Sequence, residues 1–571
     1  MTLSIPVRAA LVAALLHATA ATAQVEFDLS FIEAPQSTAN FAFGASLLAV
    51  DVDGDGFCDL VVGEPNANTK GVLWSGRAWI CYGPDFQRRK EISLRKPVER
   101  EFLATKRSVF GDFDGDGVPD LVLLAPTAQD PTFLQGGTVG RARLFRGPEF
   151  EEQILIEDPT PQLFDARFGW TAEVLNHPAT GKQELLISTP HAWSIVGGIF
   201  WYIGEIITWP DGVGARSTVI ENPEPAQTAY FGTTVVVADV NGDGQQEIVA
   251  SNHGHHPGGK LSVLDGKTKQ LLWTVSAPPS TPQYGPIISF GLPHFAGDLR
   301  GDGSVSLVVG APSTWIGPIK PGMLFVLGGP DFSVVEHAIL PPNPVHNGSY
   351  GEEAFVADVD ADGFPDIVVN SIGNSLDVFD NVVDIHFGPD FTRVQTLSLA
   401  AKSYGVEATA GDFDGDGTLE IAVTAMLGSA TGRVYIYNRR SLSADVDAIS
   451  VSAGTPVGLA LDFGVPGAHR DYLVALSLSG SAPGLIVAPG SFLPLNPDAA
   501  TLAGFALIHT TVLEGFSGTL DADGRASATL NWPAGAGTAL VGQHITLAAM
   551  ALAPGSRPGY GSSALTLPIL P

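Results

Sequence analysis

The sequence has little positive charge, almost no cysteine and, beyond its first residues, no long apolar run. Its 571 residues contain 30 Lys and Arg against 60 Asp and Glu, so the formal net charge is −30. A surface of that sign repels nucleic acid and anionic membranes and attracts cations. Nucleic acid is therefore not an expected partner. Because no stretch after the N-terminus reaches ~18 apolar residues, no transmembrane helix is expected either.

The composition that remains favours short strands. Hydrophobic residues make up 45% of the chain and charged residues 16%, with 66 Gly and 42 Pro, which is typical of many short strands joined by tight turns. In residues 1–23, Arg8 precedes an apolar run and Ala21 and Ala23 precede Gln24, a pattern typical of a cleaved secretory signal peptide. We expect an exported chain, secreted or at the cell surface, where calcium is available.

An acidic, glycine-rich string recurs along the chain. "DFDGDGVPD" at Asp112–Asp120 returns as "DFDGDGTLE" at Asp412–Glu420, and related strings begin at Asp51, Asp239, Asp298 and Asp358. The one double interval contains "NHPATGKQE" at Asn176–Glu184, a loop of equal length that has lost most of its acids. Seven units follow. A Phe-Gly or Tyr-Gly pair stands at a fixed distance before six of the seven loops, at Phe43, Phe168, Phe231, Phe290, Tyr350 and Tyr404.

Each unit predicts about four antiparallel strands, because an apolar run follows every loop and a turn such as "GPDF" follows the third strand. Such a unit cannot bury both faces alone, so we expect seven blades of one β-propeller over residues 24–440. Unit seven shows only three clear strands. We predict that Val25–Ala34, which resemble the outer strands of other units, supply its fourth strand and close the ring.

The acidic loop predicts a calcium site. Carboxylates at positions 1, 3, 5 and 9 converge if the backbone coils tightly, which glycines at positions 4 and 6 permit. Hard oxygen ligands, with the carbonyl of position 7, suit calcium better than zinc. An EF-hand would require a Glu at position 12 and flanking helices, whereas Val62 and Leu123 stand there. Solvated Asp-Gly turns are the alternative without metal.

We predict five calcium sites. Their ligands are Asp51, Asp53, Asp55, Phe57 and Asp59; Asp112, Asp114, Asp116, Val118 and Asp120; Asp239, Asn241, Asp243, Gln245 and Glu247; Asp358, Asp360, Asp362, Phe364 and Asp366; and Asp412, Asp414, Asp416, Thr418 and Glu420. In unit five Arg300 occupies position 3 and Ser306 position 9, which leaves only Asp298 and Asp302. Whether that loop holds a metal stays open, because the guanidinium could take the place of the ion.

These motifs resemble the FG-GAP repeat, the integrin α-chain type, VCBS-like calcium-binding β-propeller. The resemblance covers about three quarters of the chain. It implies calcium loops on one rim, between the first and second strands of a blade, and partner binding on the opposite face. The departures are the lost acids of unit three, Arg300 in unit five, and the absence of integrin leg domains from the sequence.

Loops on the opposite face contain aromatic and imidazole side chains. Candidates for binding a sugar, a partner or zinc are Trp193, His253, His255, His256 and Trp315, with packing and a polar surface loop as the simpler roles. The tripeptide Arg300–Asp302 lies inside a degenerate metal loop, so we interpret it as a chance occurrence.

The two cysteines, Cys58 and Cys81, both lie in unit one. If the second and third strands pair Gly63 with Gly76, the two cysteines stand opposite each other, and a cross-strand disulfide is predicted.

The repeat stops near Asp445, and residues 446–571 predict a small β-sandwich with turns at Asp523-Gly524 and Gly559. No catalytic motif stands out, so we expect a non-enzymatic extracellular binding or adhesion scaffold for a protein or glycan. Alternatives are a polysaccharide- or phosphodiester-acting enzyme and a structural envelope component.

Overall fold

The computed structural model describes residues 25–35, 42–129, 137–151, 153–160, 165–177, 180–197, 199–255, 258–371, 382–399, 404–425, 432–454, 456–481, 484–488, 491–553 and 557–571. Within these ranges nearly all of the regular secondary structure is β-strand, and α2 (Ala499–Leu507) is the one α-helix. No helix in the described part is both long and apolar enough to cross a membrane.

Six four-stranded antiparallel sheets follow one another along the chain, each in sequence order. Sheets one and two are β2 (Leu47–Val50), β3 (Asp59–Glu64), β4 (Arg77–Cys81), β5 (Arg89–Ile92), and β6 (Lys106–Gly111), β7 (Asp120–Ala125), β8 (Arg141–Phe145), β9 (Gln153–Ile156). Sheets three and four are β10 (Ala172–His177), β11 (Lys182–Thr189), β14 (Glu205–Trp209), β15 (Thr218–Glu221), and β16 (Val235–Ala238), β17 (Glu247–Asn252), β18 (Lys260–Asp265), β19 (Leu271–Ser276). Sheets five and six are β20 (Leu292–Gly297), β21 (Ser306–Ala311), β22 (Met323–Gly328), β23 (Val334–Ile339), and β24 (Glu353–Ala357), β25 (Asp366–Ser371), β26 (Val382–His386), β27 (Val394–Leu397).

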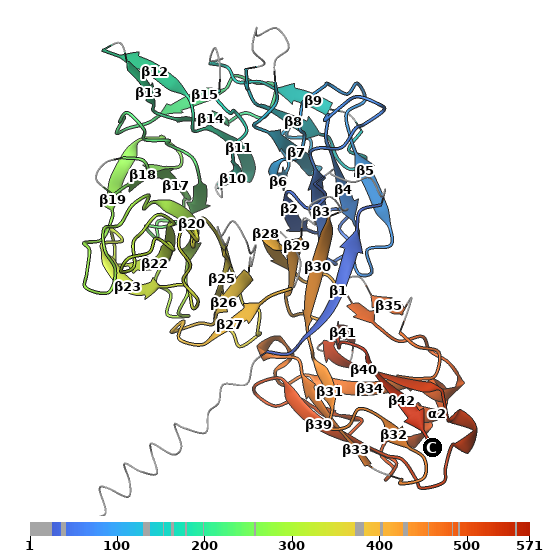
Figure 1. The fold of residues 1–571 in the computed structure, drawn as a ribbon. Coiled ribbons are helices and arrows are strands. Elements are labelled where there is room, and N and C mark those ends of the chain that lie inside the picture. The colour runs from blue at the N-terminus through green and yellow to red at the C-terminus, as the bar shows by residue number, and fades with distance from the viewer. Residues whose placement is uncertain are drawn as a thin grey trace, which may run out of the picture.

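The sheets form a closed ring. The first strand of each sheet contacts the first strand of the next, and β28 (Tyr404–Gly411) of sheet seven contacts β2 of sheet one. Figure 1 shows the sheets arranged around a common centre. The second strands are apolar runs buried along their whole length, as in β3 and β21. They are buried because side chains on both faces of a sheet pack against the neighbouring sheets, which explains why these runs do not alternate with polar residues.

Sheet seven joins the two ends of the ring. Its chain-continuous strands are β28 (Tyr404–Gly411), β29 (Glu420–Ala425) and β30 (Arg433–Arg439), and its outer strand is β1 (Phe27–Glu33). β1 pairs with β30 from Phe27 opposite Arg439 to Glu33 opposite Arg433, as Figure 1 shows by the blue strand beside the orange one. The predicted closure by the N-terminal segment is therefore confirmed.

The Phe-Gly pairs are packing elements of the ring. Phe43, Phe168, Phe231, Phe290 and Tyr350 are all almost fully buried. The glycine that follows needs a left-handed backbone: Gly44 has φ of 92°, and a Cβ there would lie 3.0 Å from a side-chain carbon of Thr424 in sheet seven. Each pair thus lets two neighbouring sheets approach closely.

The predicted disulfide is wrong. Both cysteines are free thiols, because β3 pairs with β4 two residues away from the expected register, with Leu60 opposite Cys81. Cys58 precedes β3, and its backbone N–H donates to the carbonyl of Asp412. Burial raises the pKa of each thiol to about 12, so neither is a reactive thiolate at neutral pH.

The C-terminal part consists of two sheets that share one apolar core. The first contains β31 (Leu442–Ala444), β33 (Pro456–Asp462), β39 (Arg525–Asn531) and β37 (Leu513–Glu514); the second contains β32 (Ile449–Ser450), β42 (Leu565–Leu570), β40 (His544–Ala553), β34 (Asp471–Ser477) and β38 (Ser517–Thr519), with β41 (Arg557–Gly561) on β40. A small hairpin of β35 (Leu485–Ala488) and β36 (Ser491–Leu493) and the short 3-10 helices at Val465–Gly467 and Thr538–Leu540 complete it.

One of the two turns predicted for this part differs from the structure. Gly559 lies inside β41 rather than at a turn. The turn predicted at Asp523-Gly524 is confirmed, and it connects β38 and β39, which belong to different sheets.

Candidate metal centres

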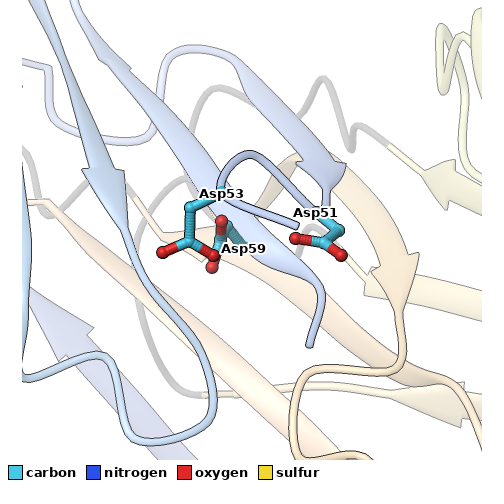
Figure 2. Close-up of side chains that lie close together, drawn as sticks. All are labelled: Asp51, Asp53 and Asp59. Atoms are coloured by element: carbon cyan, nitrogen blue, oxygen red, sulfur yellow. The ribbon is translucent and has the colours of Figure 1, made fainter. Parts of the chain in front are cut away.

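The acidic loops connect the first strand of a sheet to its second. In sheet one, Asp51 directly follows β2, Asp59 is the first residue of β3, and Asp53 lies in the loop between them. Figure 2 shows the carboxylates of Asp53 and Asp59 side by side, with that of Asp51 facing them. The strand ends therefore place positions 1 and 9 together, and the coiled loop adds position 3.

Four loops gather three carboxylates each. In every set one oxygen per residue lies within 4.8 Å of the others, and each set consists of positions 1, 3 and 9: Asp51, Asp53, Asp59; Asp112, Asp114, Asp120; Asp358, Asp360, Asp366; and Asp412, Asp414, Glu420. Among the described residues, no histidine or cysteine joins these sets. Carboxylate oxygens alone form a hard donor set, which suits calcium and not zinc.

The carboxylate at position 1 belongs to the group of three and also holds the loop backbone in its coil. The carboxylate of Asp51 accepts hydrogen bonds from the backbone N–H groups of Gly54 and Gly56, at 2.7 and 3.0 Å. Asp112 and Asp412 bind the equivalent glycines of their loops in the same way. The glycines have positive φ, so they allow the tight coil that brings the carboxylates together.

Position 5 serves the turn in all five predicted sites. Its carboxylate accepts the backbone N–H of position 7, in pairs Asp55–Phe57, Asp116–Val118, Asp243–Gln245, Asp362–Phe364 and Asp416–Thr418 at 2.8–3.0 Å. These carboxylates are not members of the groups of three. An aspartate that bonds the backbone two residues ahead is a common turn former, and sequence alone did not separate this role from metal ligation.

Position 9 connects the loop to the "GPDF" turn at the far end of the third strand, a role that the sequence analysis missed. Asp59 is fully buried and accepts N–H groups from Val52 and from Gly83, both at 2.9 Å. Asp120 and Asp366 make the same two bonds, with Gly147 and Gly388 as the turn donors. The sequence did contain a signal for this contact, because the "GPDF" turn and the position-9 carboxylate recur in the same units.

Burial makes these carboxylates costly to ionise. It raises the pKa of Asp59 to about 7, that of Asp120 to about 6 and that of Asp366 to about 8, with the backbone hydrogen bonds only partly opposing it. Burial also raises the pKa of Asp412 to about 7. A bound divalent cation would favour the ionised forms, since an opposite charge within a few ångströms offsets desolvation.

Position 3 pairs with an arginine in three of the four groups. Arg88 binds Asp53, Arg393 binds Asp360, and Arg146 approaches Asp114 at 2.6 Å. In loop seven the partner of Asp414 is instead the neutral amide of Asn438. Loop seven therefore combines three grouped carboxylates with no arginine on its third position.

Three buried carboxylate oxygens in these loops have no hydrogen-bond partner. They are Oε1 of Glu420 and Oδ2 of Asp416 in loop seven, and Oδ1 of Asp360 in loop six. Glu420 and Asp416 are each 1% exposed. A buried carboxylate oxygen without a partner costs free energy, and coordination to an ion removes that cost. The residues present thus fit calcium.

Loop four is built like the others but contains Asn241 at position 3. Its side-chain amide bonds Asp243 at 3.3 Å and Glu247 at 3.0 Å, and Asp239 accepts the N–H groups of Gly242 and Gly244. Only two of its first, third and ninth positions are acidic, and it forms no group of three carboxylates.

The loops of sheets three and five carry a side-chain cation instead. Glu184, at position 9 of loop three, lies 2.9 Å from Nζ of Lys269. In loop five, Arg300 contacts Asp302 at 3.2 Å and Glu336 of β23 at 2.6 Å. Backbone hydrogen bonds, first that of Gly303, lower the pKa of Asp298. In both loops a basic side chain pairs with a loop carboxylate, and among the described residues neither loop forms a group of three carboxylates.

The opposite ends of the sheets present the remaining candidates. His253 follows β17 and stacks on Tyr230 with ring centroids 5.7 Å apart, and burial lowers its pKa to about 4. His255 follows it in the chain, whereas His256 lies outside the described residues. Trp315 packs near His346, and Trp193 begins β12 (Trp193–Val196). Among the four of these residues that the structure describes, none joins a group of three potential metal ligands.

The C-terminal sheets cover part of the metal-loop rim. The N–H of Val465 donates to the carbonyl of Ala361 in loop six at 2.8 Å. In loop seven, a side chain on Gly417 would overlap the ring of Tyr560. The hairpin of β35 and β36 lies against Gly54 and Phe57 of loop one, where Ile486 and Val487 line a shared surface pocket.

Comparison with known proteins identifies the repeats. The FG-GAP-like repeat matches residues 335–423, and the FG-GAP repeat matches residues 43–81 and 231–264. Curated relatives include phosphatidylinositol-glycan-specific phospholipase D of Mus musculus, 30% identical over 163 residues, which are 26% of this chain and 18% of that protein. The same enzyme of Bos taurus is 26% identical over 181 residues, 29% of this chain and 21% of that protein.

The chain thus spans about a fifth of the length of the curated relatives it matches. Among solved structures, the extracellular domain of a one-component system of B. thetaiotaomicron aligns with 96% of this chain and 59% of its own, at 10% identity and a TM-score of 0.39. The repeat matches include loops one, four, six and seven, which contain three of the four carboxylate groups. The chain therefore contains FG-GAP repeats at residues 43–81 and 231–264 and an FG-GAP-like repeat at residues 335–423.

Proposed function

We propose that the protein is an exported, calcium-stabilised, seven-bladed β-propeller followed by a β-sandwich, and that it serves as an extracellular scaffold for binding a protein or a glycan. The observation that carries the proposal is the set of four carboxylate groups, each with oxygens within 4.8 Å, repeated at one end of successive sheets. Calcium bound there would neutralise the grouped charges and fix the rim of the ring.

The closed cyclic order of seven four-stranded sheets supports the propeller. The ligands of each ion would be the carboxylates of positions 1, 3 and 9, with Asp51, Asp53 and Asp59 as the example in sheet one. No reaction is needed for this role. The chemistry that calcium supplies is charge neutralisation and stiffening of the loops.

Calorimetric titration of calcium into EDTA-treated, re-dialysed protein tests the metal. We expect several sites, with Kd of about 10⁻⁴ to 10⁻³ M as in extracellular modules. At 1 mM calcium each such site adds roughly 0.4 to 1.4 kcal/mol to the free energy of unfolding. Absence of any heat, together with a melting temperature that EDTA leaves unchanged, would rule the calcium role out.

The face opposite the metal loops is the proposed binding face. An aromatic and imidazole cluster lies there, in which Tyr230 stacks on Tyr202 and His253 with centroids 5.7 Å apart and approaches His191 at 5.2 Å. Aromatic faces bind sugars and peptides through stacking. A glycan array with wild-type protein and a Tyr230→Ala variant tests this: a saturable ligand that the variant loses would support the proposal.

A second candidate is a phosphodiester-acting enzyme, which only the sequence match to the phospholipase D relatives favours. Because that match covers about a quarter of the chain, the activity of the whole relative does not transfer with it. Purified wild-type protein is assayed with a chromogenic phosphodiester, beside an Asp414→Asn variant purified in the same way. Turnover by wild type that the variant lacks would favour the enzyme over the scaffold, because a contaminating enzyme would be present in both preparations.

A further inference from the structure

Sheet three carries an extra hairpin. β12 (Trp193–Val196) and β13 (Ile199–Tyr202) lie between β11 and β14 and pair only with each other, as a separate two-stranded sheet. They leave the ring at the end opposite the metal loops, because they connect the second strand of the sheet to the third. In Figure 1 the hairpin projects outward from the ring.

The tip of this hairpin is apolar and exposed. Ile195, Val196, Ile199 and Phe200 are 58%, 45%, 55% and 47% exposed. Ile195 lies opposite Phe200 and Val196 lies opposite Ile199 across the two strands. Because successive side chains point to opposite faces, one apolar pair lies on each face of the hairpin, and the tip is apolar on both sides. Soluble surfaces seldom gather apolar side chains in this way without a binding role.

An aromatic collar stands directly behind the tip. Trp193 pairs with Tyr202 across the strands, and Trp201 is the next residue along β13. All three are half-buried. The sequence from Ala192 to Gly204 contains no acidic or basic residue. Apolar side chains at the tip and Trp and Tyr behind them match the order in which a bilayer presents its acyl chains and its headgroup boundary.

The base of the hairpin is fixed to the ring. The N–H of Tyr202 donates to the carbonyl of Gln227 at 2.8 Å, and its carbonyl accepts the N–H of Tyr230. The ring of Tyr202 stacks on that of Tyr230, and His191 packs edge-on against it. An anchored base lets the tip be presented in one orientation rather than folding back onto the ring.

We propose that this hairpin docks the protein onto a zwitterionic lipid surface by inserting its tip into the headgroup and acyl boundary. Strands of four residues extend about 13 Å, which is sufficient for an insertion of ~5–10 Å with the collar at the interface. Charge selects the kind of surface. The tip carries no charge to desolvate, while the net charge of −30 opposes approach to anionic lipid.

Vesicle sedimentation tests the proposal with the full chain. Sucrose-loaded phosphatidylcholine vesicles are incubated with wild type and with Ile199→Asp and Phe200→Asp variants, in EDTA so that calcium cannot bridge protein and lipid. We expect wild type to sediment with the vesicles and each variant to bind at least tenfold more weakly, because a charge at the tip must be desolvated. Vesicles containing phosphatidylserine should bind less wild type at low salt.

The control is Val334→Asp, because Val334 of β23 is also apolar and is 54% exposed but lies outside the hairpin. This variant should bind the vesicles as strongly as wild type does. Circular dichroism melting should be unchanged in all three variants, since the altered side chains are exposed. Equal vesicle binding by wild type and the tip variants would overturn the proposal. So would light scattering that shows a wild-type dimer dispersed by the tip variants, which would assign the patch to a second copy of the chain.

Discussion

At the scale of single residues, the acidic loops of this chain differ in the side chain that pairs with their carboxylates. Arg300 and Lys269 are built-in basic groups at loops five and three, whereas Asp414 of loop seven has only the amide of Asn438. Loop seven also contains buried oxygens without partners on Asp416 and Glu420. Loop seven should consequently depend on calcium most strongly, and loop five least.

Replacing Asp414 by Asn should have opposite effects with and without metal. In 1 mM calcium the variant loses a ligand, and its melting temperature should fall, with a loss of roughly 1 kcal/mol. In EDTA, burial and the neighbouring Asp416 and Asp412 raise the pKa of Asp414 well above its ordinary value, so ionising or protonating this carboxyl costs the folded chain free energy. The neutral amide of Asn removes that cost, and the melting temperature should rise. Differential scanning fluorimetry in both conditions measures the two shifts.

Asp302→Asn in loop five is the matched control, because Arg300 already neutralises that loop. Its shift in melting temperature should not depend on calcium. If Asp414→Asn instead lowered the melting temperature equally in calcium and in EDTA, the carboxylate would have a purely structural role.

A second residue-scale prediction concerns the centre of the ring. Glu407 of β28 lines an axial cavity of about 750 Å³ together with Glu173, Glu353, Lys106 and Arg107. Burial, with a smaller contribution from Glu353, raises the pKa of Glu407 to about 8, although Lys106 and Arg107 oppose the shift. Burial likewise raises the pKa of Glu173 to about 7.

Both glutamates hold their protons in the folded chain at pH values at which the unfolded chain has lost them. Their contribution to stability is therefore complete below about pH 4.5 and disappears as the pH rises through 7 and 8. Glu407→Gln should flatten this decline, by an amount on the order of 1 kcal/mol between pH 5 and 8. Urea titrations at several pH values, in a constant calcium concentration, measure it; an unchanged slope in the variant would contradict the assignment.

At the scale of elements, the fold followed from repetition. Seven units, the buried second strands and the N-terminal outer strand could all be predicted from the sequence, because each sheet buries its apolar run against its neighbours wherever the motif recurs. The register in which β3 pairs with β4 could not be predicted from the sequence. The pairing of β3 with β4 is set by the long connection between them, residues 65–76, whose bends the pattern does not encode, so Cys58 and Cys81 were misplaced.

The candidate site divided in the same way. Positions 1, 3 and 9 are brought together in four of the five predicted loops, and loop four, with Asn241 at position 3, forms no group of three carboxylates. The turn-forming role of position 5 and the bond from position 9 to the turn glycine, such as Asp59 to Gly83, were missed. These depend on which oxygen faces which N–H, and a one-dimensional pattern contains no such information. The side-chain cations at Arg88, Arg146 and Arg393 come from other strands or turns and were missed for that reason.

The closing strand gives an element-scale prediction with a built-in control. Along β1, Ile32 is 2% exposed and its neighbour Phe31 is 51% exposed, because successive side chains point to opposite faces. Ile32→Ala should lower the free energy of unfolding by about 2–4 kcal/mol, whereas Phe31→Ala should change it by well under half of that. Similar losses for both variants, measured by denaturant unfolding, would contradict the packing of β1 in sheet seven.

At the scale of the whole molecule, the C-terminal sheets rest on the rim that carries the metal loops. Val465 bonds Ala361 of loop six, Tyr560 covers Gly417 of loop seven, and Arg439 of β30 lies 2.8 Å from Asp462 of β33. Order in loops six and seven should therefore stabilise the junction between the two parts of the chain.

Hydrogen exchange tests this junction. Removal of calcium by EDTA should increase amide exchange at Val465 and around Tyr560 by tenfold or more, because the loops beneath them lose their shape. Helix α2, which packs on β34 away from the rim, should exchange at the same rate in both conditions. Unchanged exchange at Val465 while loop seven itself loosens would show that the junction is independent of the metal.

The pairing of β1 with β30 also affects the order of events during biosynthesis. Glu33 and Arg433, joined by an ion pair, are separated by 400 positions. At synthesis rates of about 5–20 residues per second, the first strand must wait roughly 20–80 s for its partner. Throughout that interval sheet one can form while the ring remains open, with unpaired edges exposed to other nascent chains. Completion of the ring is thus a late step, and any agent that delays translation between β1 and β30 lengthens the period in which the chain is prone to aggregate.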